Sequence, residues 1–341
     1  MKAFYIVPLI LPVFLVSCKQ KAEEPRKESE MTSNYQTTGS IERIHRSIDQ
    51  LIAKDAVIEI LAEGFTWSEG PLWIEDGKYL LFSDIPPNVI NKWSEEEGVT
   101  RFLFPSGYTG RTERGGEPGS NGLVLDAKGK LVMCQHGDRK MARMLPPLSR
   151  PNAMFETIID NYQGKKFNSP NDAVFDSKGN LYFTDPPYGL EENMDDPKKE
   201  LDFQGVFRYS SDGQLTLISD QMSRPNGIGL SPDEKTLYVS NSDGDARLWM
   251  AFELNEDGEV ISQSVFYDAT DDELSGYPDG LKVDKKGNIW ATGPGGIIIF
   301  SPEAKILGRI KTGQATSNCA FDTEEKTLYM TCDDYLMRVK L

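Results

Sequence analysis

The stretch NSPNDAVFDSKGNLYFTD, residues 168–185, shows the unit from which the fold is built. A polar residue opens one strand, the turn from Asp176 to Gly179 reverses the chain, and a second strand begins at Leu181. Asp and Gly in a short polar turn between two apolar runs predict a β-hairpin. The second strand, LYFTD, has counterparts in LLFSD from Leu80, LVMCQ from Leu131, LYVSN from Leu237, IWATG from Ile289 and LYMTC from Leu328.

These six hairpins lie 39 to 56 residues apart, and strand patterns fill the sequence between them. Repeats of this size match the four-stranded blades of a β-propeller. The last repeat lacks one strand, which the run AVIEIL at 56–61 can supply, so that the two chain ends close the ring and remove its exposed edges. The sequence therefore predicts one all-β domain over residues 41–341, a six-bladed β-propeller closed by an N-terminal strand.

A different pattern covers the first 52 residues. Lys2 precedes an apolar run over 3–16, which is too short for a membrane span of ~20 residues and fits a signal peptide at 1–17. The end of this run, LVSC, resembles a bacterial lipobox, in which Cys18 would carry the lipid; an ordinary signal peptide with a chance cysteine is the alternative. Residues 18–40 are predicted to be a polar tether. Apolar residues at helical spacing from Ser40, the expected N-cap, to Ile52 predict a short amphipathic helix.

This N-terminus predicts an exported bacterial lipoprotein in the periplasm or outer membrane, touching the membrane only through its lipid. The net charge of −16, from 53 acidic and 37 basic residues, disfavours nucleic acid as a partner and suits cations. The two histidines, His45 and His136, leave little room for chemistry that needs a histidine pair. No CxxC spacing occurs among the cysteines.

A carboxylate or carboxamide opens the first strand of every repeat, ten or eleven residues before the second strand. Such residues beside Gly or Pro are ordinary turn formers. Six in register, however, converge on the central channel of a propeller, where two buried carboxylates require a cation. Since all the donors are oxygens, the column favours a hard cation such as Ca²⁺ or Mg²⁺. The six residues are Glu69, Asn121, Asn171, Asn226, Asp279 and Asn318.

Other polar residues are expected at the same mouth, because the second strand of each hairpin returns to it. This places His136, Asp185 and Tyr188 near the cation, with His136 either a proton carrier or a hydrogen-bonded rim residue. The loop at 105–119 carries Arg111 and Arg114 and either covers the mouth or is solvated. We predict substrate contacts from Asn121, His136, Tyr188 and Arg111.

At these residues the chain resembles the gluconolactonase branch of the senescence-marker-protein/regucalcin family. The resemblance implies a six-bladed propeller with a central divalent cation that hydrolyses lactones. It further implies that Glu69, Asn226 and Asp279 are the core metal ligands and that Asn171 is a fourth ligand or a substrate contact. Ca²⁺ is the expected ion, with Mg²⁺, Mn²⁺ or Zn²⁺ as alternatives. The segments that carry the resemblance are EGFTWSEGPLW, LLFSDIPPNVINKW, GSNGLVLD, CQHGDRK, NSPNDAVFDSKGNLYFTDPPYG, RPNGIGLSPDEKTLYVSNS, YPDGLKVDKKGNIW and SNCAFD.

The expected activity is hydrolysis of a sugar lactone, with glucono-1,5-lactone as the leading substrate. A bound cation would polarise the lactone carbonyl. Asp279, with Asn171 beside it, or a metal-bound water would assist the attack. Two alternatives remain, a phosphotriesterase-like hydrolase on the same site and a non-catalytic ligand-binding propeller. The absence of GxSxG and of GxGxxG before a helix disfavours a serine hydrolase and a nicotinamide enzyme.

Overall fold

The computed structural model describes residues 1–5 and 35–341. The chain divides into two units, Met1–Asn34 and Tyr35–Leu341, and all the described strands belong to the second. Most of the predicted signal peptide, including its end at Cys18, and most of the tether lie outside the described residues. Among the residues that are described, none forms a helix with the length and apolar character needed to cross a membrane.

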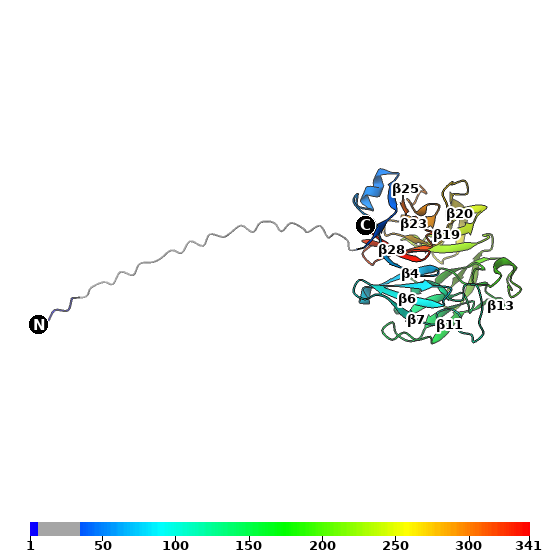
Figure 1. Ribbon diagram of the computed structural model, residues 1–341, viewed down its shortest axis with the longest axis horizontal. Coiled ribbons are helices and arrows are strands. Elements are labelled where there is room, and N and C mark those ends of the chain that lie inside the picture. The colour runs from blue at the N-terminus through cyan, green and yellow to red at the C-terminus, as the bar shows by residue number, and fades with distance from the viewer. Residues whose placement is uncertain (6–34) are drawn as a thin grey trace. The chain divides into compact units, whose positions relative to one another are not determined.

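The second unit consists of six antiparallel sheets that follow one another in chain order (Figure 1), as the six hairpins predicted. Blade 1 comprises β4 (Ser68–Ile74), β5 (Tyr79–Asp84), β6 (Val89–Ser94) and β7 (Gly98–Leu103). Blade 2 comprises β8 (Ser120–Leu125), β9 (Leu131–Gln135), β10 (Lys140–Met144) and β11 (Phe155–Ile159). Blade 3 comprises β14 (Ala173–Phe175), β15 (Leu181–Asp185), β16 (Gly205–Tyr209) and β17 (Leu215–Ser219).

Blade 4 comprises β18 (Pro225–Leu230), β19 (Thr236–Asp243), β20 (Ala246–Leu254) and β21 (Val260–Asp268). Blade 5 comprises β22 (Leu281–Val283), β23 (Ile289–Gly293), β24 (Gly296–Phe300) and β25 (Ile306–Lys311). Blade 6 comprises β26 (Asn318–Phe321), β27 (Thr327–Cys332), β28 (Tyr335–Lys340) and β3 (Ile58–Glu63). The first strands of the blades contact each other in the closed order β4, β8, β14, β18, β22, β26 and back to β4, so they surround one axis.

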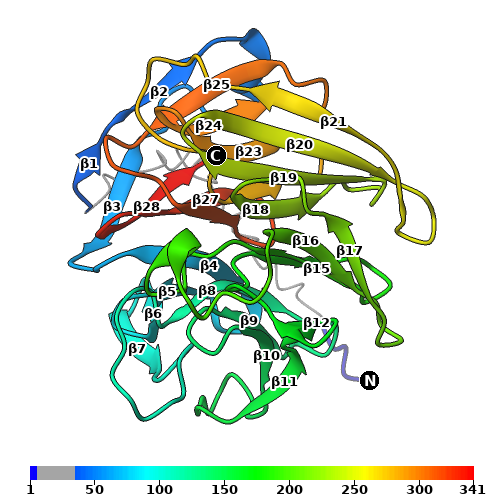
Figure 2. The same cartoon turned by 90° about the vertical axis from the view of Figure 1, so that its right-hand side faces the viewer.

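The ring closes through strands from opposite ends of the chain. Strand β3 pairs antiparallel with β28, and the two lie side by side in Figure 2. This confirms the predicted N-terminal closing strand, which comes from the run AVIEIL and the two residues after it. Strand β3 thus completes blade 6 as its fourth strand.

The segment before β3 differs from its prediction. Residues Ser40–Arg43 form strand β2, which pairs with β25, and β1 (Thr37–Thr38) pairs with β3. The helix is therefore shorter than expected: it is the 3-10 helix η1 (Arg46–Gln50), capped by His45 rather than Ser40. The free edge of blade 5 provides backbone partners for residues 40–43, which outweighs their helical spacing. Ile48 and Ile52 are buried against blades 5 and 6, as the apolar spacing predicted, whereas Ile44 of the same predicted face is 50% exposed.

Three of the hairpin turns share one chemical cause. The Asp176 carboxylate accepts hydrogen bonds from the backbone N–H groups of Lys178 and Asn180, at 3.0 and 2.8 Å, while Gly179 has a φ of 82° that other residues rarely adopt. The same arrangement recurs at Asp126 and Asp284. The apolar faces of neighbouring blades pack between these hairpins and form a core around the axis.

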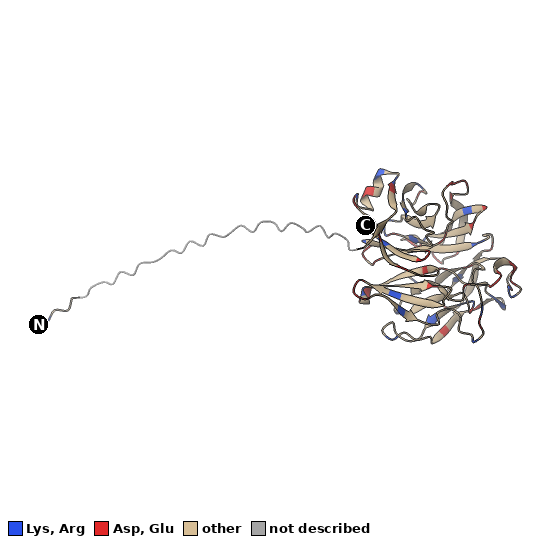
Figure 3. Ribbon diagram, in the orientation of Figure 1, with Lys and Arg blue, Asp and Glu red and all other residues tan. Residues whose placement is uncertain are grey.

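Two further 3-10 helices and the hairpin β12–β13 lie outside the blades. They are η2 (Glu75–Gly77), η3 (Asn193–Asp195), β12 (Asn161–Tyr162) and β13 (Lys165–Lys166). Charged residues of both signs are spread over the blades (Figure 3). Cys134, Cys319 and Cys332 are buried free thiols.

Candidate active site

A cavity of about 910 Å³ lies where the first strands of the blades begin. Five of the six residues of the predicted polar column line it, together with Tyr188. The sixth, Asn318, does not line the cavity. The five column residues in the wall are Glu69, Asn121, Asn171, Asn226 and Asp279.

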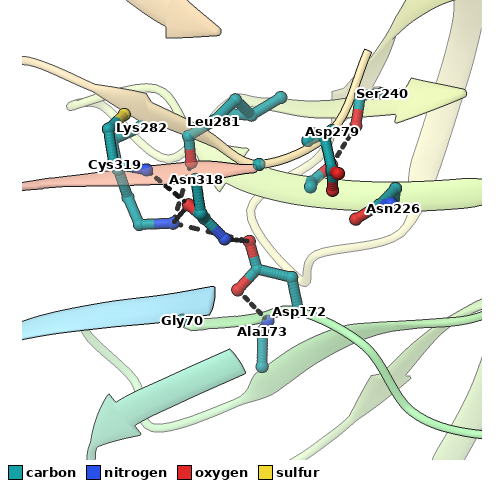
Figure 4. A network of polar contacts seen from close by, with 12 residues as sticks. Gly70, Asp172, Ala173, Asn226, Ser240, Asp279, Leu281, Lys282, Asn318 and Cys319 are labelled. Carbon is teal, nitrogen blue, oxygen red and sulfur yellow. Dashed lines mark hydrogen bonds and ion pairs between the residues drawn. The ribbon is translucent and has the colours of Figure 1, made fainter. Parts of the chain in front are cut away.

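The column residues are held by the strands that carry them. Glu69, Asn121 and Asn226 lie in β4, β8 and β18, whereas Asn171 and Asp279 lie just before β14 and β22. All are buried except Asp279, which is partly exposed to the cavity. Asp279 and Asn226 lie next to each other (Figure 4). Within the described part of the chain, Oδ1 of Asp279 and Oδ1 of Asn121 are buried acceptors without a hydrogen-bond partner.

Glycine follows most column residues because the blades approach each other closely at this point. A Cβ atom on Gly227 would lie 2.3 Å from the carbonyl oxygen of Asp279, and one on Gly70 would lie 2.2 Å from that of Asn121. The Gly122 N–H donates to the carbonyl of Asn171 at 2.7 Å. The repeated SEG, SNG, PNG and PDG tripeptides thus combine one axial side chain with one contact between neighbouring blades.

Two charged residues that the sequence analysis did not place on the axis lie beside the column. Nζ of Lys282 is 3.4 Å from Oδ2 of Asp172 and 3.3 Å from Oδ1 of Asn318 (Figure 4). Nδ2 of Asn318 lies 3.4 Å from Oε2 of Glu69 and 3.4 Å from Oδ2 of Asp172. Neither Lys282 nor Asp172 is among the six residues that open the first strands. One sign of this charge was visible in the sequence: Asp172 directly follows a column residue, at the position where four other repeats have glycine.

The axis has an excess of negative charge. Burial, with Asp172 nearby, raises the pKa of Glu69 to about 8. Burial first, and then Glu69, Glu117 and Asp172, raise the pKa of Asp279 well above its ordinary value. The ammonium of Lys282 pairs with Asp172, and a dication would relieve the repulsion among the carboxyl groups.

The donor set fits a hard divalent cation. Carboxylate and amide oxygens converge there, and Asp279 Oδ1 is unpartnered within the described residues. The set mixes two carboxylates with amides; no group of three or more His, Cys, Asp or Glu side chains placed to bind a metal occurs in residues 1–5 and 35–341. Glu69, Asn171, Asn226 and Asp279 are the residues that would hold the ion.

The cavity wall contains one of the predicted rim residues, Tyr188. Its hydroxyl donates to the carbonyl of Ser242 at 3.5 Å, and burial raises its pKa to about 12. The guanidinium of Arg224 lies 5.9 Å from the centre of the Tyr188 ring and also lines the cavity. Arg224, two residues before Asn226, was not predicted, although a residue two positions along a strand points to the same side.

Asp185 has a positioning role rather than a place in the wall. Its two carboxylate oxygens accept hydrogen bonds from the backbone N–H groups of Asn168 and Ser169, each at 2.8 Å. These bonds fix the segment that leads to Asn171. Asp84 binds the N–H groups of Thr66 and Trp67 ahead of Glu69 in the same way.

The remaining predicted contacts lie away from the cavity wall. Arg111 is exposed in the loop at 105–119 and is not among the lining residues. His136 is completely buried, and its Nδ1 lies 3.2 Å from Oε2 of Glu117, which does line the cavity. Arg114 bonds the carbonyls of Gly137 and Gly189. The loop is therefore attached to blades 2 and 3, and it delivers Glu117, which the sequence analysis missed.

Six blades around an oxygen-lined axial cavity define a propeller that binds a small molecule at one end of its axis. The profile of the SMP-30/gluconolactonase/LRE-like region matches residues 67–333. The chain belongs to this family.

Individual relatives agree with this assignment. The gluconolactonase of Zymomonas mobilis is 38% identical over 341 residues, covering 97% of this chain and 94% of the relative. The pentonolactonase of Haloferax volcanii is 24% identical over 267 residues, covering 77% and 80%. A solved structure of a Xanthomonas campestris gluconolactonase matches with a TM-score of 0.75 and 30% identity, over 90% of this chain and 96% of that one. The chain is a lactone hydrolase.

Proposed function

We propose that this protein hydrolyses a sugar lactone, such as glucono-1,5-lactone, at a divalent cation held by Glu69, Asn171, Asn226 and Asp279. The observation that carries the proposal is the partly exposed Asp279 carboxylate, whose Oδ1 lacks a partner among the described residues beside a second buried carboxylate. An all-oxygen donor set favours Ca²⁺, with Mg²⁺, Mn²⁺ and Zn²⁺ as the ions to compare. A gluconolactonase 38% identical over nearly the whole chain supports the choice of substrate.

The bound ion would supply Lewis-acid polarisation of the lactone carbonyl. The protein's own groups would place the sugar ring. Asn121 offers an unpartnered amide oxygen for a hydroxyl group, and Arg224 and Tyr188 form one wall of the cavity. Asn171, as a ligand of the ion, would orient the reacting carbonyl. Asp279 would either accept a proton from the attacking water or serve only to hold the ion.

The test is lactone ring opening in a weakly buffered pH assay, with spontaneous hydrolysis subtracted. Activity is expected to disappear with EDTA and to return with one of the four ions. A lactone and an organophosphate triester are compared to test the phosphotriesterase alternative. Asp279→Ala should abolish turnover, whereas Asp257→Ala, an exposed carboxylate on blade 4, should not. Full activity of the protein in EDTA would contradict the metal proposal, and retained turnover by Asp279→Ala would remove this residue from the mechanism.

We also propose that the protein is an exported lipoprotein, anchored by lipid on Cys18 in the periplasm or outer membrane. The support is the apolar run ending in LVSC and the polar segment after it. Metabolic labelling with a fatty acid should mark the wild type and Cys134→Ala but not Cys18→Ala. Labelling of Cys18→Ala, or its unchanged membrane fraction, would contradict the anchor.

A further inference from the structure

Glu117 is a carboxylate in the cavity wall that comes from outside the axial column. It is supplied by the loop at 105–119, whereas every proposed cation ligand lies at the start of a first strand. Its side chain is 32% exposed, and its charge contributes to the raised pKa values of both Glu69 and Asp279. Glu117 lines the same cavity as Glu69 and Asp279, so it can reach a molecule that is bound there.

His136 lies directly behind Glu117. Its side chain is 0% exposed, and its Nδ1 is 3.2 Å from Oε2 of Glu117. This is a contact distance rather than an aligned hydrogen bond, because neither ring nitrogen has a well-oriented partner among the described residues. A buried imidazole without aligned partners is costly. In enzymes without bound substrate, catalytic hydrogen bonds are often poorly aligned, and they tighten only when substrate binds.

The surrounding chain is built to hold this pair. A Cβ atom on Gly189 would lie 2.6 Å from the Cβ of His136, and one on Gly137 would lie 2.4 Å from the carbonyl oxygen of Pro118. Only glycine allows the two segments to approach so closely. Arg114 donates to the carbonyls of Gly137, which follows His136, and of Gly189, which packs against the Cβ of His136, so the loop carrying Glu117 is tied to both segments.

We infer that Glu117 is a catalytic residue, the proton carrier of lactone hydrolysis, and that His136 is its positioning residue. The assignment rests on the proposed function, because an Asp279 carboxylate that holds a dication is a weak base. The water oxygen forms a bond to the lactone carbonyl carbon while the C=O π pair moves to the carbonyl oxygen and one water proton passes to Glu117. The C=O bond re-forms as the ring C–O bond breaks, the electron pair of that bond goes to the ring oxygen, and the ring oxygen takes the proton from Glu117. Water and lactone give the hydroxy acid, and Glu117 is regenerated.

The full-length protein is the subject of the test, with kcat and KM measured on glucono-1,5-lactone and Ca²⁺ affinity measured by calorimetry. Glu117→Gln should lower kcat by about 10²- to 10⁴-fold, the usual contribution of a general acid or base, with KM and Ca²⁺ affinity nearly unchanged. Formate should restore part of the activity of Glu117→Ala. Glu113→Gln, an exposed carboxylate in the same loop, is the matched control and should behave as the wild type.

His136 is tested by measuring the effects of its substitutions on kcat and on KM separately. His136→Leu should lower kcat at unchanged KM, and His136→Gln, which keeps a polar group near Glu117, should recover part of the loss. Equal activity of His136→Leu and the wild type would overturn the positioning role of His136. Circular dichroism of each variant separates these effects from misfolding.

Three results would overturn the Glu117 assignment. They are a kcat of Glu117→Gln within twofold of the wild type, a change in KM alone, or a loss of Ca²⁺ affinity as large as that of Glu69→Gln, which would make Glu117 a ligand. If the wild type does not open glucono-1,5-lactone, the proposed substrate is wrong instead. The same variants are then compared on an aliphatic lactone, which still tests Glu117.

Discussion

Nε of Arg338 lies 2.5 Å from Oε2 of Glu59, although 279 residues separate them in the sequence. The two are register partners on β28 and β3, and both side chains are buried. This ion pair therefore joins the ends of the chain where the ring closes. Glu59→Gln should lower the free energy of unfolding by about 3 kcal/mol, because it leaves Arg338 partly uncompensated in the interior. Urea denaturation measures the change.

The control for ring closure is Glu324→Gln. It removes one partner of an exposed ion pair with Lys326, and surface pairs contribute little to stability. Its unfolding curve should match that of the wild type. If both variants shift the curve equally, the Glu59–Arg338 pair has no special role in closure.

Lys282 provides the second prediction, because it is the ammonium that faces Asp172 on the axis. Lys282→Met should destabilise the metal-free protein by about 2 kcal/mol, below the range for a fully buried pair since its side chain is 29% exposed. Adding Asp172→Asn should recover most of the loss, as a double-mutant cycle would show. Additive losses in the double variant would mean that the two groups do not interact.

The third prediction concerns stability against pH in EDTA. The pKa of Glu69 rises from 4.5 to about 8 on folding, so the folded state binds more protons than the unfolded state between these values. The metal-free protein should therefore lose stability as pH rises from 4.5 to 8, and the raised pKa of Asp279 acts in the same direction. The rise in Tm on adding Ca²⁺ should grow over the same range, because protons compete with the ion.

Thermal melts with and without EDTA measure this pH dependence. Glu69→Gln should flatten the metal-free curve, since it removes one titrating group. Asp185, whose pKa is raised by burial to about 7, leaves a residual slope in both conditions. A metal-free Tm that increases with pH would contradict the prediction.

Asp185 is the subject of the fourth prediction. Asp185→Asn leaves one acceptor oxygen for the two N–H groups of Asn168 and Ser169 and should destabilise the protein by about 1–3 kcal/mol. Displacement of Asn171 should also lower kcat by at least about tenfold, because small misplacements near a reacting centre are costly. Steady-state kinetics and urea denaturation measure the two effects.

Asp176→Asn is the matched variant for this experiment. Asp176 accepts from the backbone N–H groups of Lys178 and Asn180 through Oδ1 and from the Asn180 side-chain amide through Oδ2, and it lies in a hairpin turn away from the cavity. It should lose stability without losing kcat. Equal losses of kcat in the two variants would show that Asp185 acts through general stability rather than through Asn171.

The first strands and their polar openings were predictable because they depend on local chemistry that repeats. The Asp–X–X–Gly turns at 126–129, 176–179 and 284–287 each form within four residues and reverse the chain between the first and second strands of a blade. Register within a hairpin then sets the position of Glu69, Asn121, Asn171, Asn226 and Asp279 relative to their second strands. The position of Tyr188 was predictable for the same reason, because this residue lies only three residues after the end of β15.

The start of the domain was predicted less well, because residues 40–43 have two compatible conformations. Their isoleucine spacing suits a helix, and only the free edge of β25 makes the strand β2 favourable. Likewise, nothing in the residues next to Arg111 and Arg114 indicates which of the two arginines anchors the loop. The carbonyls of Gly137 and Gly189, which come from other blades, decide that Arg114 anchors the loop.

The sequence by itself determined the number of blades, the closing strand and the polar column, because each follows from a repeat or from pairing between adjacent strands. Only the tertiary structure decided which charges meet on the axis. Lys282 and Asp172 are 110 residues apart, and Glu117 meets His136 across a loop whose path depends on distant carbonyls. Side-chain contacts between blades depend on how the ring closes, and no local pattern in the chain encodes them.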